Sequence, residues 1–120
     1  TTLQDYDTWF YVPGTPIRAL SDLIGVYHAS VGSNGLLELD FAIDRDGLVD
    51  PVHAAQYAAF GSWIRSCYGQ SINSTSGNGT YFLVDVPSTA TIDRVVIQED
   101  QSFGQRIRVY DYVFLVLLLN

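Results

Sequence analysis

Residues 35–69, GLLELDFAIDRDGLVDPVHAAQYAAFGSWIRSCYG, carry the clearest structural signals in the chain. The apolar run 36–43 predicts a short strand that is buried on both faces. Asp50 is a natural N-cap, and Pro51 suits the first helical position because its missing N–H would have no partner there. Apolar residues then recur at helical spacing until Gly69, where the helix is expected to end: Tyr57, Phe60, Ile64, Cys67 and Tyr68.

Residues 20–33 predict another amphipathic helix, which precedes the strand. Ser21 is its expected N-cap, and Asp22 suits the positive end of the helix dipole. One face is apolar: Leu20, Leu23, Ile24, Tyr27 and Val31. We interpret His28, beside this face, as a solvated helix residue rather than a ligand or base. The order helix, strand, helix with short connections is typical of an α/β fold with parallel strands.

The length and charge of the chain limit the kinds of protein to which it can belong. With 120 residues it falls in the range of one domain, well below the roughly 250 of a complete (β/α)8 barrel. Its hydrophobic content of 48% argues against disorder, because a core can be filled. The net charge is −7 and Lys is absent, so we expect neither nucleic acid nor a membrane surface as a partner.

The single cysteine and the two glycosylation sequons bear on the cellular compartment of the protein. Cys67 is the single cysteine, which excludes an intrachain disulfide, and its place on a helix predicts a small buried apolar side chain. Asn73-Ser-Thr and Asn78-Gly-Thr make Asn73 and Asn78 candidate N-glycosylation sites and favour a secretory parent protein. No signal peptide is recognisable at Thr1.

The composition changes after residue 70. Residues 71–80 are rich in Ser, Asn and Gly and predict a linker or exposed loop. Beyond them the pattern predicts antiparallel strands at 81–86, 92–98 and 105–112. The expected organisation is therefore an α/β part over 1–70, a linker over 71–80 and a β part over 81–120. The apolar end Val113–Asn120 is interpreted either as a buried last strand or as a coding artefact.

The acidic loop between strand and helix does not have the ligand pattern of a calcium site. A calcium-binding hand with Gly47 at its sixth position would place Ala42 first and His53 twelfth, and neither can supply the required carboxylate. A turn over 45–47 followed by the Asp50 cap explains the loop without a metal. We predict no metal and no cofactor.

Asp40 is the most interesting carboxylate, because it ends the predicted strand and such ends face the active site in α/β folds. A structural hydrogen-bonding role is the commoner outcome at such positions. A hydrolytic pair would need a second carboxylate about 5–10 Å away, and no motif positions Asp5, Asp7 or Glu38. Nucleotide-binding and nucleophile-elbow motifs do not occur. No reaction follows from residue spacing alone.

Longer stretches resemble a known family. WFYVPG at 9–14, LSDLIGVYHASVGSNGLLELD at 20–40 and the stretch 44–69 closely resemble glycoside hydrolase family 29, the α-L-fucosidases. TIDRVVIQEDQSFGQRIRVYDY at 91–112 resembles a strand pair in the C-terminal β-sandwich of that family. The plant-like and bacterial members are the most similar. Together these stretches span most of residues 9–112.

The resemblance implies a fold, an activity and a partner. Residues 1–69 would be the end of a (β/α)8 catalytic barrel, and residues 81–112 would be strands of a truncated β-sandwich. Family members hydrolyse α-L-fucosides with retention, using an aspartate nucleophile and a second carboxylate as acid/base. Both lie in upstream segments, so this chain holds no match for either. Trp9 and Phe10 match the aromatic segment that walls the fucose pocket, and a fucosylated glycan is the implied substrate.

Departures from the family pattern shape the functional hypotheses. Asp40 stands where the family has Asn, the 41–43 segment lacks the usual Pro-Pro, the 68–92 region is short, and 114–120 has no match. We therefore predict a fucosidase-like fragment that is inactive alone, from a secreted or lysosome-like parent. The alternatives are a non-catalytic carbohydrate- or partner-binding remnant and a chain without stable function.

Overall fold

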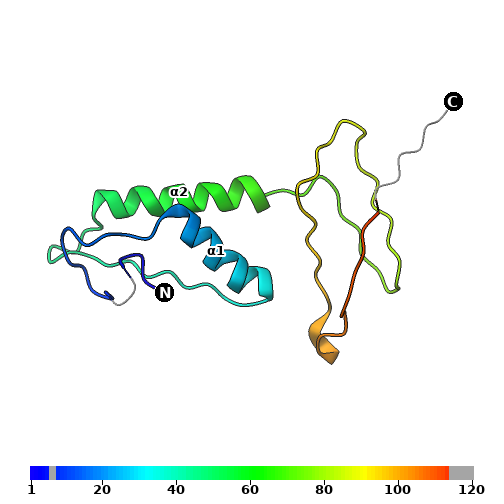
Figure 1. The fold of residues 1–120 in the computed structure, drawn as a ribbon, viewed down its shortest axis with the longest axis horizontal. Coiled ribbons are helices and arrows are strands. Elements are labelled where there is room, and N and C mark those ends of the chain that lie inside the picture. Colours follow the sequence, from blue (N-terminus) through cyan, green and yellow to red (C-terminus); the bar gives the residue numbers. More distant parts are fainter. Residues whose placement is uncertain (6–7, 114–120) are drawn as a thin grey trace. The chain divides into compact units, whose positions relative to one another are not determined.

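The computed structural model describes residues 1–5 and 8–113, which belong to two compact units (Figure 1). The first unit spans 1–84, and the second begins at residue 85. The described residues hold two α-helices and two short 3-10 helices: α1 (Leu20–Ser30), η1 (Val31–Ser33), α2 (Pro51–Tyr68) and η2 (Gln101–Phe103). Pairing between extended segments is limited to isolated bridges in this part of the chain. The expected α/β fold, a barrel end followed by β-sandwich strands, is therefore wrong.

Helix α2 follows its local sequence signals closely. Asp50 is the N-cap, and its Oδ1 accepts a hydrogen bond from the Val52 N–H at 2.8 Å. Pro51 occupies the first helical position. At the other end the N–H of Gly69 donates to the Arg65 carbonyl at 3.0 Å, with φ of −70° in the right-handed region. The predicted start and end of this helix are confirmed.

Helix α1 forms where it was predicted but begins differently. Its N-cap is Ala19, which makes no side-chain capping bond, and Ser21 lies inside the first turn. The predicted Ser21 cap is therefore wrong. The α-helix ends at Ser30 and tightens into η1, after which Asn34 takes the left-handed conformation with φ of 64°. Asn is one of the residues that tolerate this conformation well, so the turn is encoded locally.

The predicted strand over 36–43 is extended backbone without a sheet. One parallel bridge joins Thr2 to Asp40, and one antiparallel bridge joins Ile43 to Val49 across the acidic turn. The side chain of Leu36 is 90% exposed, whereas a strand covered on both faces would bury it. The prediction fails because a strand needs a neighbour along its length, and pairing of this segment is limited to residues 1–2 and to Val49.

The core of the first unit joins three segments that are distant in the sequence. Its buried apolar side chains are Leu3, Leu23 of α1 and Phe60 of α2, with partly buried apolar residues packed around them. The flanking Thr2 and Gln4 are buried as well. Their polar groups are satisfied locally: the Gln4 amide bonds both the N–H and the carbonyl of Val12 at 3.3 Å. The N-terminal residues, which read as polar in the sequence, are thus the most buried segment.

The second unit is irregular over its described residues, 85–113. The strands predicted at 92–98 and 105–112 do not form, nor does the one at 81–86, which begins in the first unit and ends in the second. Carboxylates organise local turns instead: Glu99 accepts from the N–H groups of Arg106 and Ile107, and Asp100 caps η2. Most of the large apolar side chains here are exposed. The predicted terminal strand, Val113–Asn120, lies outside the described residues except for Val113.

Candidate functional site

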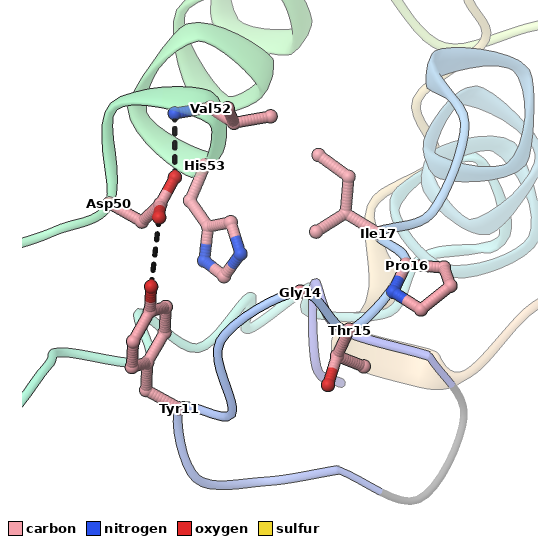
Figure 2. A pocket seen from close by; sticks show the side chains of 8 residues that line it. All are labelled: Tyr11, Gly14, Thr15, Pro16, Ile17, Asp50, Val52 and His53. Carbon is pink, nitrogen blue, oxygen red and sulfur yellow. Dashed lines mark hydrogen bonds between the residues drawn. The ribbon is translucent and has the colours of Figure 1, made fainter.

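Tyr11 and Asp50 bring the first loop of the chain to the start of helix α2. The Tyr11 hydroxyl donates a hydrogen bond of 2.9 Å to Asp50 Oδ2, while Asp50 Oδ1 caps the helix (Figure 2). The two carboxylate oxygens therefore accept from different partners, one from the loop and one from the helix backbone. The Asp50 side chain serves as a helix cap and as the anchor of the loop at once.

His53 lies directly behind this pair, on the first turn of α2. Its side chain is only 5% exposed, and its Nδ1 has no hydrogen-bond partner among the described residues. The imidazole meets the Tyr11 ring edge to face, with centroids 5.6 Å apart and planes at 67°. Figure 2 shows the imidazole between Tyr11 and the loop that carries Ile17. A buried ring nitrogen without a partner is uncommon, since such groups are normally satisfied.

The hydrogen bond shifts the ionisation of both partners. The Tyr11 hydroxyl and the Val52 N–H stabilise the carboxylate and lower the pKa of Asp50 below its ordinary value. The same bond, together with the nearby negative charges of Asp50 and Asp44, raises the pKa of Tyr11. At neutral pH the site therefore presents an anionic carboxylate and a neutral phenol.

Two depressions flank this cluster. The first, which we call the His53 pocket, has a volume of about 270 Å3 and is lined by Tyr11, Gly14, Thr15, Pro16, Ile17, Asp50, Val52 and His53. The second, the Phe10 depression, has a volume of about 630 Å3 and is lined by Phe10, Tyr11, Val12, Pro13, Ile43, Asp44, Arg45 and Asp46. Tyr11 forms part of both walls. Both lie within the first unit.

Of the two residues predicted to contact the sugar, only Phe10 lines a depression. Phe10 is 86% exposed and lines the Phe10 depression, together with the acidic turn. Trp9 is also exposed, at 60%, but lines neither depression. The structure thus brings Phe10 next to polar side chains of the 44–46 turn and leaves Trp9 beside this surface.

The acidic loop has the local structure that was predicted. Asp44 Oδ1 accepts hydrogen bonds from the N–H groups of Asp46 and Leu48, at 2.9 and 2.8 Å. Gly47 takes a left-handed conformation with φ of 78°. Among the described residues, no group of three or more His, Cys, Asp or Glu side chains is arranged to hold a metal ion.

Asp40 forms two hydrogen bonds through its backbone. Its N–H donates to the Thr1 carbonyl at 2.9 Å, and its carbonyl accepts from the Tyr57 hydroxyl. Of the carboxylates weighed as its partners, Asp5 uses its N–H to bond Pro16, and Asp7 lies outside the described residues. These bonds tie the extended segment to α2.

The remaining candidates lie elsewhere. His28 is exposed, as expected, but its Nε2 is 2.7 Å from the Tyr68 hydroxyl, and its ring packs on Trp63, so it is not simply solvated. Cys67 is half-buried. Asn73 and Asn78 lie on an exposed segment without regular structure, and their glycosylation stays a prediction.

Sequence reasoning missed the Tyr11–Asp50–His53 cluster. Tyr11 was assigned no functional role from the sequence, and His53 was named only in rejecting a calcium-binding loop. A signal was present: a histidine three residues after an N-cap lies on the first helical turn, close to the capping carboxylate. Its burial, however, depends on a loop 39 residues earlier in the sequence.

Comparisons of the chain with protein-family models, with curated proteins and with solved structures gave no match. The α-L-fucosidase resemblance therefore rests on the sequence stretches quoted above. Within the described residues, no helix has the length and apolar character needed to cross a membrane.

Proposed function

We propose that this chain is a fucosidase-like fragment that recognises a fucosylated sugar and does not hydrolyse it by itself. The stretches shared with α-L-fucosidases carry this proposal. The family nucleophile and acid/base belong to segments upstream of the Trp9-Phe10 motif, and no residue here matches them. Recognition without hydrolysis is the activity that the residues present can support.

The Phe10 depression supports the recognition step. It combines the highly exposed Phe10 ring with charged side chains of the turn at 44–46. Sugar sites pair apolar walls, on which the C–H face of a ring packs, with a few polar groups that orient the hydroxyls. Asp46 and Arg45 are exposed and can accept from and donate to such hydroxyls.

The size of the core supports the fragment part of the proposal. Only Leu3, Leu23 and Phe60 are buried hydrophobic residues in the described chain, while large apolar side chains stay exposed in both units. A domain of about 150 residues ordinarily buries nearly 70% of its unfolded surface. Exposed apolar side chains on this scale are expected of a segment that other parts of an enzyme cover.

A fluorescence titration tests recognition. In a Trp63→Phe variant, Trp9 is the only indole left and reports on the neighbouring Phe10 depression. We expect L-fucose to change its emission saturably, with binding about tenfold weaker after Phe10→Ala. Phe103→Ala is the matched control, because Phe103 is similarly exposed, at 79%, but lies in the second unit. An unchanged emission at millimolar L-fucose would refute recognition.

An activity assay tests the absence of hydrolysis. The purified chain is incubated with an aryl α-L-fucoside, and release of the chromogenic alcohol is followed. We expect the rate of a heat-inactivated sample. Turnover above that control would show that the chain supplies reactive carboxylates of its own.

A further inference from the structure

The chain contains two asparagine-glycine pairs, Asn34-Gly35 and Asn78-Gly79. An asparagine that precedes a glycine is especially prone to spontaneous loss of its side-chain amide, because glycine has no side chain to obstruct attack by its own backbone nitrogen. Both asparagines are exposed, so access to water does not distinguish them. The two pairs differ instead in their hydrogen bonds and in their backbone conformation.

This deamidation proceeds in two steps, and water is the only co-reactant. The backbone nitrogen of the glycine loses its proton and bonds to the asparagine Cγ, while the side-chain nitrogen takes up a proton and leaves as ammonia. The product is a five-membered cyclic imide. Water then opens the ring, which gives aspartate when the bond from the ring nitrogen to Cγ breaks and isoaspartate when the bond to the main-chain carbonyl carbon breaks. Nothing is oxidised or reduced.

The turn after η1 holds Asn34 in a geometry that opposes ring closure. The Gly35 N–H, whose nitrogen would have to attack, donates to the Ser30 carbonyl at 2.7 Å. Asn34 has φ of 64° and ψ of 25°, which place its Cβ and the Gly35 nitrogen on nearly opposite sides of the Cα–C bond. Ring closure needs these two atoms on the same side. The turn must therefore open before Asn34 can react.

The Asn78-Gly79 pair lacks these restraints. Its segment, 71–80, is exposed and has no regular secondary structure. The Gly79 N–H donates no hydrogen bond to any residue that the structure describes. A Cβ added at Gly79 would meet no atom closer than 4.0 Å. Rotation about the Cα–C bond of Asn78 can therefore bring the Gly79 nitrogen to Cγ without breaking a backbone hydrogen bond of that nitrogen.

From this contrast we infer that Asn78 is a spontaneous modification site, which deamidates through a cyclic imide with Gly79, and that the turn after η1 protects Asn34. The product carries one added negative charge at neutral pH and no longer has the asparagine of the Asn78-Gly-Thr sequon. Deamidation and the predicted N-glycosylation therefore exclude each other at this residue. The inference does not rest on the proposed fucoside recognition.

Peptide mapping of the full, unglycosylated chain tests the contrast within one molecule. Cleavage after arginine places Asn34 in the peptide 19–45 and Asn78 in the peptide 66–94. After incubation at mildly alkaline pH, mass spectrometry measures the gain of one mass unit in each peptide, and fragmentation separates Asn78 from Asn73. We expect Asn78 to convert at least about tenfold faster than Asn34, with isoaspartate among its products. An unconverted Asn78, equal rates or faster conversion of Asn34 overturns the inference.

Two further measurements separate the effect of the fold from that of the dipeptide. In guanidinium chloride the turn is lost, and we expect Asn34 to convert as fast as Asn78; a difference in rate that persists in the denatured chain would contradict protection by the turn. Gly79→Ala places a methyl group beside the attacking nitrogen at an exposed position. We expect it to slow Asn78 several-fold and to leave Asn34 unchanged. An unchanged rate at Asn78 would exclude the Gly79 nitrogen as the attacking group.

Discussion

The Tyr11 hydroxyl donates to Asp50 Oδ2 at 2.9 Å, joining two residues that are 39 positions apart in the sequence. The bond attaches the first loop to the N-terminus of α2, where the other oxygen of the same carboxylate accepts from Val52. The same hydrogen bond positions the Tyr11 ring, which lines both depressions. Removing it should alter the ionisation of Asp50, the helix start and the shape of the site together.

Tyr11→Phe removes the hydroxyl and keeps the ring. We expect the pKa of Asp50 to rise toward its ordinary value of 3.8, because the Tyr11 bond is the largest cause of its lowering. Since that pKa is lowered in the folded state, Asp50 contributes stability above the ordinary pKa and loses it as pH falls through the folded value. The carboxyl carbon signal of Asp50, followed by NMR from pH 6 to about pH 2, measures the change. An identical Asp50 titration in both proteins would contradict the bond.

Asp50→Ala removes the helix cap. We expect the free energy of unfolding to fall by about 1 kcal/mol, the usual effect of losing an N-cap side chain. Urea unfolding followed by circular dichroism at 222 nm measures it. Asp46→Ala is the control, since Asp46 is an exposed acidic residue of the same loop. Equal effects of the two substitutions would mean that negative charge, rather than the cap, explains the loss.

Tyr57→Phe should change the response to alkali. Burial and the negative charge of Asp40 raise the pKa of Tyr57 from its ordinary value of 10.0 to about 12. A raised pKa means that the folded state holds the proton more tightly, so the associated stability is complete below pH 10 and is lost as pH rises toward 12.

We therefore expect Tyr57→Phe to be less stable than the unmodified chain at pH 8 and to lose less stability between pH 9 and 11. Phe41 stacks on this ring at 3.7 Å between centroids, and the substitution preserves that contact. Tyr81→Phe, which removes an exposed hydroxyl, should leave the profile unchanged. Parallel profiles for all three proteins would show that the Tyr57 hydroxyl has no special role.

Phe60→Ala tests the core. Phe60 is 6% exposed and is one of three buried hydrophobic residues among those the structure describes, so its truncation removes a large share of the apolar burial. Substitutions of this kind cost about 3–5 kcal/mol, enough to unfold a small unit. We expect loss of the helical signal at 222 nm at 25 °C. Phe103→Ala, at an exposed site, should keep the signal; a fully helical Phe60→Ala would show that the core lies elsewhere.

Two glycines should respond to alanine in opposite directions. Gly47 has φ of 78°, so Gly47→Ala forces a side chain into the left-handed region and should cost about 1–2 kcal/mol. Gly25 lies inside α1, where an added Cβ meets no atom within 4 Å, so Gly25→Ala should stabilise by about 1 kcal/mol. Urea midpoints of the two variants check the prediction. Shifts in the same direction would contradict the turn or the helix.

Features governed by neighbours in the chain were predictable from the sequence. The limits of α2 follow from the Asp50 cap, Pro51 and Gly69, and all are in place. The acidic turn follows from Asp44 and Gly47, whose bonds and backbone angles are local. Helix α1 was placed well, although its cap residue was not, because the helix starts two residues earlier, with Ala19 as its N-cap.

That the predicted strands form no sheet in the described residues could not be foreseen in the same way. Apolar runs such as 36–43 and 92–98 have the composition of strands, but a strand forms only beside a partner. For 36–43 the partners are limited to residues 1–2 and Val49, and 92–98 has no ladder in the described chain. The composition of a segment shows that it can form a strand, but it does not show that a partner strand is present.

The amino-acid sequence by itself determined the two helices, the capped start of α2 and the turn before it, because each depends on contacts within a few residues. Tertiary structure alone decided that Thr2, Leu3 and Gln4 are buried, that Tyr11 reaches Asp50 and that His53 is enclosed with a free ring nitrogen. These features join segments far apart in the chain, and the free energy of such contacts depends on which surfaces meet, a quantity that no local pattern contains.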